Sequence, residues 1–304
     1  MTEDFLYWLD QISPSHRSWV GDKAFYLGVL AQRGYAQPPG FVISAGVFQE
    51  FLTQVQWADP LFADLPNSSL HIDADNPRQL RMVAQQLRQA IQSTPLPATW
   101  VAQIEQNIQP WRSSALILRP SIALPMVSDP TVSFRTTGLL TAEACWTEPD
   151  AIATSLRRVW SSLFQAKSLL YWQRLGIQLQ QINLAILVQP LQSVIASGDA
   201  QLQEQQLEIR ATWGLGKGLV NGEIIPDRIQ ISLPTGKQSQ QLGSKSYAYR
   251  IPAATDTIAP LPIQTCNCYE IYPLPPTQQS QPVLNVDQTQ QIAALVQQVA
   301  NEVG

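Results

Sequence analysis

The sequence predicts a mixed α/β fold of the α+β type with two lobes, and three observations support this prediction. Segments with the spacing of amphipathic helices alternate with short apolar runs that are typical of strands. The order of these segments lacks the regular βαβα alternation of a doubly wound sheet. The 304 residues suffice for one large domain of two lobes or for two domains that share a core.

The first third of the chain is predicted to be mainly helical. Ser44 can cap one helix, whose apolar stripe contains Phe48, Phe51, Leu52 and Val55. Asn76 and Pro77 can begin a second helix, because they place a cap before a proline at the first helical position; its stripe contains Leu80, Val83, Leu87 and Ile91. Between the two helices, residues 41–43 follow a Pro-Pro-Gly break and predict a short buried strand.

The middle third is predicted to combine several strands with one long helix. Residues 116–119 form a short apolar strand that ends in a charge. A capping box at 147–150 begins a helix that covers 151–175 and ends at Gly176. Further strands are predicted at 182–188, 207–211 and 228–231.

The last third contains fewer regular elements. Residues 252–282 are rich in Pro, Thr and Gln and contain one strand-like piece at 268–272. Asp287 is predicted to cap a closing helix, whose apolar face contains Ile292, Leu295, Val296 and Val299. The chain has no internal repeat of the kind that builds solenoids.

Composition and charge argue against a nucleic-acid partner. The net charge is −4, and charged residues make up 14% of the chain, about half of the usual share. The sequence contains 38 glutamines, so uncharged amides cover much of the surface instead. The densest basic cluster is better explained as a solvated helix face than as a nucleic-acid site; it consists of Arg157, Arg158, Lys167 and Arg174.

The sequence also argues against a membrane span and a metal site. No apolar run approaches the 18 residues or so that a spanning helix needs, and the acidic N-terminus is unlike a signal peptide. Three cysteines, Cys145, Cys266 and Cys268, with two histidines, His16 and His71, form no metal-binding pattern. The sparse, odd number of cysteines indicates a reducing compartment, so a cytoplasmic protein is expected.

Four collinear segments carry a family resemblance. In this order and spacing they resemble the N-terminal nucleotide-binding domain of phosphoenolpyruvate synthase and pyruvate phosphate dikinase. That family reads Val-Gly-Gly-Lys-Ala with Pro-Pro-Gly-Phe, then Val-Arg-Ser-Ser-Ala, then Val-Gln, then Gly-Leu-Gly-Glu with Pro-Asp-Arg. The matching segments here are Val20-Gly21-Asp22-Lys23-Ala24 with Pro38-Pro39-Gly40-Phe41, then Leu118-Arg119-Pro120-Ser121, then Val188-Gln189, and then Gly214-Leu215-Gly216-Lys217 with Pro226-Asp227-Arg228. The resemblance covers nearly the whole chain and is weakest at 52–113 and after 232.

The resemblance implies an ATP-grasp-like fold in which ATP lies between two lobes. Lys23 and Arg119 would then approach each other and contact the phosphates, because a triphosphate needs fixed cations and a guanidinium matches phosphate oxygens. Val188 and Gln189 would lie along the adenine, where a strand edge can pair with its polar rim. The lobes are expected at 1–112 and 113–304. Taken alone, Lys23 is better explained as a solvated lysine at a helix start, and Arg119 could simply pair with an acid.

The glycine segment around Lys217 does not form a P-loop. That loop needs Gly-x4-Gly-Lys followed by Ser or Thr, whereas here the first glycine would fall on Ala211 and Gly218 replaces the hydroxyl residue. A tight glycine turn is the simpler interpretation, and direct phosphate contact is the alternative. Within the resemblance, Lys217 stands where the family has an acid, so we expect it to replace part of the charge of the metal.

The departures from the family pattern concern the acids that hold magnesium. Pro120 replaces a serine and removes an N–H donor, and the next acid is delayed to Asp129. The Phe-Thr-x-Asp-Pro stretch of the family is absent after Gly198. In the family, a strand with metal-binding acids and a Gln-x-Arg follows the closing helix, and the sequence here stops at Gly304, before it. ATP is therefore the expected ligand, whereas magnesium stays open.

These observations leave two interpretations of function. In the first, the chain is a stand-alone nucleotide-binding domain with weak or no phosphotransferase activity. In the second, it is a degenerate pseudoenzyme that acts as a scaffold, regulator or assembly factor for another protein. A complete dikinase reaction is not expected, because His16 and His71 match no family motif that could receive a phosphoryl group. No catalytic residue is assigned, and the sequence names no acceptor substrate or protein partner.

Overall fold

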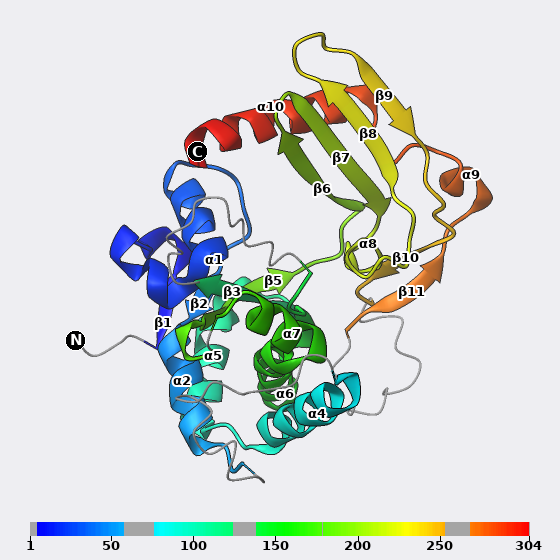
Figure 1. Ribbon diagram of the computed structural model, residues 1–304. Helices are drawn as coiled ribbons and strands as arrows, with labels where there is room; N and C mark the ends of the chain where they lie inside the picture. Colours follow the sequence, from blue (N-terminus) through cyan, green and yellow to red (C-terminus); the bar gives the residue numbers. More distant parts are fainter. Residues whose placement is uncertain (1–4, 58–75, 124–137, 178, 253–267, 304) are drawn as a thin grey trace. The chain divides into compact units, whose positions relative to one another are not determined.

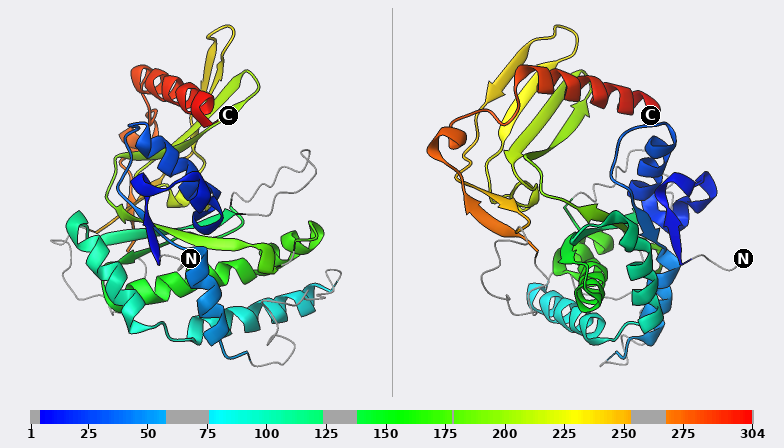
Figure 2. Two further views of the ribbon diagram at one scale, coloured as in Figure 1. Left: turned by 90° about the vertical axis from the view of Figure 1, so that its left-hand side faces the viewer. Right: turned by 180° about the vertical axis from the view of Figure 1, so that it is seen from behind.

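The structure, a computed structural model, describes residues 5–57, 76–123, 138–177, 179–252 and 268–303. The chain divides into two compact units, Met1–Leu191 and Gln192–Gly304. The predicted mixed α/β class is confirmed, because each unit combines helices with antiparallel strands (Figures 1 and 2). The expected lobes, 1–112 and 113–304, differ from these units. The reason is that strands on both sides of residue 112 pair within one sheet of the first unit.

In its described part, the first unit is built on a five-stranded antiparallel sheet with the strand order β1-β2-β5-β3-β4. The predicted strand at 41–43 is confirmed as β2, and the one at 116–119 extends at both ends. Strand β5 lies in the middle of the sheet, between β2 and β3. The strands are β1 Leu6–Trp8, β2 Phe41–Ile43, β3 Ala115–Ala123, β4 Glu143–Trp146 and β5 Asn183–Leu191.

Helices cover both faces of this sheet. On one face lies α1, Arg17–Gln32, which packs through Val20 and Ala24. On the other face a larger core contains the stacked rings of Phe51 and Trp160, whose centroids are 4.8 Å apart. The helices that contribute to this larger core are α2 Ala45–Gln54, α4 Pro77–Ser93, α5 Ala98–Ile108, α6 Pro149–Ser161 and α7 Ala166–Arg174.

The second unit contains, among its described residues, a four-stranded antiparallel sheet with the order β6-β7-β8-β9. Its apolar face, with Leu207, Ile209 and Ile229, packs against Ala293 of the last helix. A separate two-stranded antiparallel sheet consists of β10 and β11. The elements are β6 Ala196–Gln203, β7 Gln206–Trp213, α8 Lys217–Val220, β8 Asp227–Ser232, β9 Gln238–Gln241, β10 Tyr247–Arg250, β11 Glu270–Pro273, α9 Pro276–Gln279 and α10 Val286–Val303.

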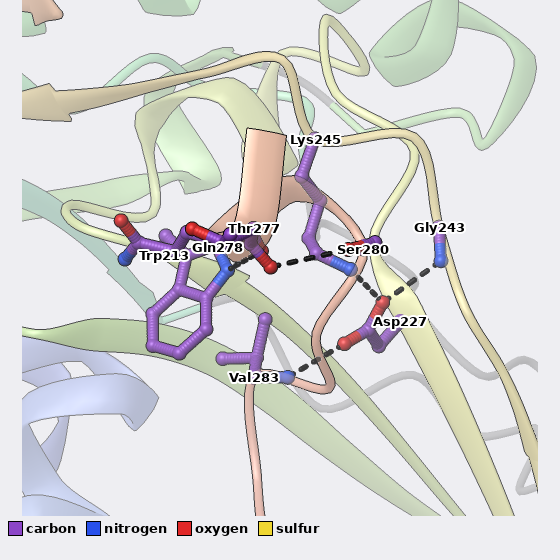
Figure 3. Close-up of polar contacts among 8 residues, drawn as sticks. All are labelled: Trp213, Asp227, Gly243, Lys245, Thr277, Gln278, Ser280 and Val283. Atoms are coloured by element: carbon purple, nitrogen blue, oxygen red, sulfur yellow. Dashed lines mark hydrogen bonds and ion pairs between the residues drawn. The ribbon is translucent and has the colours of Figure 1, made fainter. Parts of the chain in front are cut away.

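A buried ion pair connects three segments of the second unit (Figure 3). The amine of Lys245 donates to the carboxylate of Asp227, and the two side chains are 0% and 1% exposed. The same carboxylate accepts from the backbone N–H groups of Gly243 and Val283, each at 2.8 Å. Because Asp227 is the first residue of β8, this carboxylate fixes the start of that strand to the segments that lead into β10 and α10.

The predicted helix at 151–175 is two helices rather than one. Helix α6 ends at Ser161, and Gln165 has extended backbone angles of φ −66° and ψ 148° before α7 begins. The intervening 3-10 turn buries Leu163 and Phe164, each 1% exposed. A continuous helix would also turn these side chains towards the core, since they follow Trp160 at helical spacing, so apolar periodicity does not detect the break.

The helix caps agree with the sequence in one of four places. The capping box predicted at 147–150 is wrong, since Glu148 precedes α6 without a side-chain cap bond. Asn76 caps α4 as predicted, since its side chain accepts from the N–H of Gln79 at 3.2 Å. The helix after Ser44 forms, but without the predicted side-chain cap bond. The closing helix α10 is capped by Asn285 instead of Asp287. Asn285 and Gln288 exchange two hydrogen bonds, of 2.8 and 3.0 Å, which together satisfy two backbone donors.

Two features are absent from the described ranges. These ranges contain no helix with the length and hydropathy needed to cross a bilayer. They also contain no group of three His, Cys, Asp or Glu side chains that could bind a metal ion. Cys145 and Cys268 are both buried. Cys266, His71 and Asp129 lie outside the described residues.

Candidate functional site

The site begins at Gly21, where helix α1 is interrupted. Gly21 has φ +78° and ψ 162°, which a residue with a side chain rarely adopts. A Cβ atom at this position would lie 2.4 Å from the carbonyl carbon of Ser121. Glycine is therefore required twice, for its backbone angles and for the close approach of α1 to β3. The consequence is a second helical start at residue 22, directly over β3.

Lys23 and Ala24, just after the interruption, bind α1 to β3. The amine of Lys23 donates to the backbone carbonyl of Pro120 at 2.8 Å. The N–H of Ala24 donates to the buried hydroxyl of Ser121 at 3.0 Å. The side chain of Lys23 remains exposed to solvent. Lys23 is thus held in place by a neutral acceptor, with its side chain exposed and its amine partly buried against β3.

Arg119 lies on the same face of the sheet as Ser121, two residues away along β3. Its guanidinium Nη1 donates to the side-chain oxygen of Gln189 on β5 at 3.3 Å. The amide of Gln189, which is 5% exposed, donates in turn to the carbonyl of Pro38 at 3.3 Å. Gly40 permits this arrangement, since a Cβ there would lie 2.9 Å from Gln189 Cγ. Gln189 therefore orients Arg119. We call Lys23, Arg119, Ser121 and Gln189 the Lys23 site.

The electrostatics of the Lys23 site are dominated by two cations. Desolvation and then the charge of Arg119 lower the pKa of Lys23 to about 8. Desolvation also lowers the pKa of Arg119. No ion pair with a carboxylate is made by either cation within the described part of the chain. The site therefore carries two neighbouring positive charges, and an anion is the ligand that would relieve their repulsion.

Val188 and Gln189 occupy different positions, although they are adjacent in sequence. Val188 is 1% exposed and belongs to the larger core on the opposite face of the sheet. It lies between Phe41 of β2 and Leu118 of β3 in the strand register. The strand edge expected here is therefore absent, because β5 is a central strand of the described sheet. Gln189 alone of this pair brings its side chain to the Lys23 site.

Lys217 belongs to the second unit and lies against aromatic rings. Its amine is 4.4 Å from the ring centroid of Tyr269 and 5.1 Å from that of Tyr249. The glycine turn before it packs tightly on β10, since a Cβ at Gly214 would lie 2.4 Å from the carbonyl oxygen of Tyr249. The simpler interpretation, a tight turn, thus describes the backbone. Cation–π contact with the two tyrosines orients the lysine charge.

The contacts of Lys217 with two tyrosines, and the carboxylate beside these tyrosines, were not predicted from the sequence. The hydroxyl of Tyr249 donates to Glu223 at 2.5 Å, and this bond raises the pKa of Tyr249 to about 12. Hydrogen bonds from Tyr249 and then Asn221 lower the pKa of Glu223, with a smaller contribution from the charge of Lys217. The tyrosines follow Lys217 by 32 and 52 residues. Their alternation with polar residues predicts a strand but gives no sign of the contact.

Comparison with known proteins gives one family and several relatives. Residues 17–304 match the family described as Pyruvate phosphate dikinase, AMP/ATP-binding domain. Phosphoenolpyruvate synthase of Aeropyrum pernix is 26% identical over 242 residues, which cover 76% of this chain and 29% of that protein. Probable phosphoenolpyruvate synthase of Methanothermobacter thermautotrophicus is 23% identical over 229 residues, covering 72% of this chain and 32% of that protein. Rifampicin phosphotransferase of Streptomyces sviceus is 24% identical over 239 residues, covering 76% of this chain and 27% of that protein. The chain thus spans less than a third of the length of each of these relatives.

Proposed function

The chain belongs to the family of the pyruvate phosphate dikinase AMP/ATP-binding domain, and we propose that it binds ATP at the Lys23 site. The observation that carries the proposal is the pair of cations, Lys23 and Arg119, which lack a carboxylate partner among the described residues. A nucleoside triphosphate brings about four negative charges, which this pair partly neutralises. Gln189 orients Arg119, and Val188 supports Gln189 from within the sheet.

Magnesium does not fit the residues that the structure describes. Magnesium at a nucleotide site is usually held by one or two carboxylates besides the phosphates, and neither cation of the Lys23 site has a carboxylate partner among the described residues. The family acid is replaced by Lys217, whose amine lies over two tyrosine rings. Glu223 is a single exposed carboxylate and already accepts a hydrogen bond from the hydroxyl of Tyr249. A lysine neutralises phosphate as a point charge but cannot bridge two phosphates as the metal does. We therefore propose nucleotide binding that depends weakly on magnesium.

Phosphoryl transfer is proposed to be slow or absent. The reaction requires positioning and charge neutralisation of the transferred group, which a metal held by carboxylates normally supplies. The named relatives are phosphoenolpyruvate synthases and a rifampicin phosphotransferase, and each is more than three times as long as the matched part of this chain. Their activities are therefore not transferred to the 304 residues. The second candidate function, a scaffold or regulatory protein, is favoured by the same lack of a metal-binding cluster in the described ranges.

Calorimetric titration with ATP tests the proposal. We expect binding to the wild type both with magnesium and with a chelator, and at least a tenfold weaker affinity for Lys23→Ala, because charge-assisted hydrogen bonds to phosphate contribute about 1.5–3 kcal/mol. Lys167→Ala is the matched control, since Lys167 is also exposed and also donates to a backbone carbonyl, that of Gly138 at 2.8 Å. Absence of binding to the wild type under both conditions would support the scaffold function. Binding that vanishes with the chelator would contradict the proposed independence from magnesium.

A further inference from the structure

The chain has five lysines, and Lys23 differs from the other four in its surroundings. Lys245 is fully buried and paired with Asp227, and Lys217 lies over tyrosine rings. Lys167 and Lys237 are exposed. Lys23 alone combines an exposed side chain with a neighbouring guanidinium, that of Arg119. An amine beside an anion-binding group can react with an anion that carries an electrophilic carbon.

We propose that Lys23 is a modification site that accepts an acyl group from a small acyl phosphate. The inference rests on the anion-binding role of Arg119 in the proposed function. The guanidinium of Arg119 is oriented by Gln189 and can hold the phosphate part of the reagent through two parallel N–H bonds. The carbonyl carbon of an acyl phosphate is joined to the phosphate through a single oxygen. It therefore lies within reach of an amine beside the guanidinium.

The chemistry is a simple acyl transfer that needs no oxidant, reductant or metal. The neutral amine of Lys23 attacks the carbonyl carbon, a C–N bond forms, and the C–O bond to the phosphate breaks. Inorganic phosphate leaves with the electron pair of that bond, and the nitrogen loses one proton to the solvent. Two features favour the reaction. Arg119 stabilises the leaving phosphate. The lowered pKa of Lys23, about 8, leaves a larger neutral fraction at neutral pH than an ordinary lysine has.

Acylation would change the charge of the site without removing its anchor. The amide product keeps one N–H, which can still donate to the carbonyl of Pro120, so α1 stays on β3. The positive charge of Lys23 is lost, and only Arg119 remains to neutralise an anion there. An acyl phosphate would therefore regulate the Lys23 site by lowering its affinity for ATP.

The experiment treats the full chain with acetyl phosphate at about pH 7 and measures acetylation of each lysine by peptide mass spectrometry. We expect Lys23 to react about tenfold faster than Lys167 and Lys237 in the same sample, because its neutral fraction is larger. ATP or inorganic phosphate should protect Lys23 and leave the two control lysines unchanged. A parallel reaction with p-nitrophenyl acetate, which carries no phosphate, separates phosphate guidance from general reactivity. At Lys23, the rate of acetylation by acetyl phosphate is divided by the rate with p-nitrophenyl acetate. The variant Arg119→Ala should lower this ratio.

The possible results distinguish this inference from the proposed function. Acetylation of Lys23 no faster than that of Lys167 would overturn the inference, whether or not ATP binds in calorimetry. An equal preference for Lys23 with both reagents would overturn the assignment of an acyl phosphate. Fast, phosphate-protected acetylation of Lys23 in a protein that does not bind ATP would support the inference and refute the proposed function.

Discussion

Lys245 of the second unit and Lys23 of the first unit hold their charges in opposite surroundings. In the second unit, Lys245 is fully buried and donates to Asp227, whose carboxylate accepts two further backbone N–H groups. In the first unit, Lys23 is exposed, donates to a neutral carbonyl and has the cation Arg119 as its neighbour. A buried charge needs a partner and filled hydrogen bonds, and Lys245 has both. Two adjacent cations without an acid among the described residues repel each other, and the proposed anion would relieve this repulsion.

The largest expected effect comes from breaking the paired lysine. Asp227→Ala leaves Lys245 as an uncompensated buried charge, and we expect a loss of about 3–5 kcal/mol in the free energy of unfolding of the second unit. Thermal and urea denaturation measure this loss. The control is Asp199→Ala, because the ion pair of Asp199 with Arg210 at 2.8 Å is about one third exposed and should contribute about 1 kcal/mol or less. Equal effects of the two variants would show that the buried pair is not structural.

The second prediction removes the neighbour of Lys23. Arg119→Ala should weaken ATP binding by about 10- to 100-fold, the effect of losing a charge-assisted hydrogen bond to phosphate. The free energy of unfolding should stay equal or rise, because the repulsion between two cations is relieved. Calorimetry and urea denaturation of the same preparation give both values. The prediction would be contradicted if Arg119→Ala were destabilised as strongly as Asp227→Ala and bound ATP with unchanged affinity. Arg119 would then stabilise the fold and would not bind the ligand.

The difference between the two lysines could be predicted only in part from the sequence. Lys23 and Arg119 were found from collinear motifs, but their proximity depends on the register in which α1 packs on β3, across 97 residues of sequence. Such long-range register follows from the whole core, and local patterns do not specify it. The buried pair was missed because Asp227 and Lys245 are 18 residues apart in polar segments. Pairing allows polar residues to be buried there, and hydrophobic periodicity cannot detect them.

The third prediction uses the pH dependence of the unpaired lysine. Folding lowers the pKa of Lys23 to about 8, so the protonated form is disfavoured in the folded protein. Without ATP, the free energy of unfolding should therefore rise as the pH increases from about 8 towards the pKa of an unfolded lysine, about 10.4. ATP prefers the charged amine, so its affinity should be constant below pH 8 and fall by up to about tenfold per pH unit above it.

Calorimetry in buffers of different ionisation enthalpy measures this effect, because ATP binding near pH 8 should be accompanied by proton uptake. The matched control is Lys23→Arg, since a guanidinium stays charged throughout this range. Its ATP affinity should not change between about pH 7 and 9. A wild type that shows the same flat profile would mean that neither desolvation nor the neighbouring Arg119 lowers the pKa of Lys23.

The smallest expected effect concerns Lys217. Its surroundings are intermediate between those of Lys23 and Lys245, because its charge is stabilised by aromatic rings rather than by a carboxylate. Cation–π contacts contribute about 0.5–1 kcal/mol at partly exposed sites, so Lys217→Met should lower the free energy of unfolding of the second unit by about this amount. Methionine keeps the length and the apolar contact with Tyr249 and Tyr269, and it removes only the charge. Lys237→Met is the control in an exposed turn and should change the stability by less. A stabilised Lys217→Met variant would mean that the rings do not neutralise this lysine in the unliganded protein. The charge of Lys217 would then resemble that of Lys23. Each would lose solvation in the folded protein, and only a bound anion would compensate for this loss.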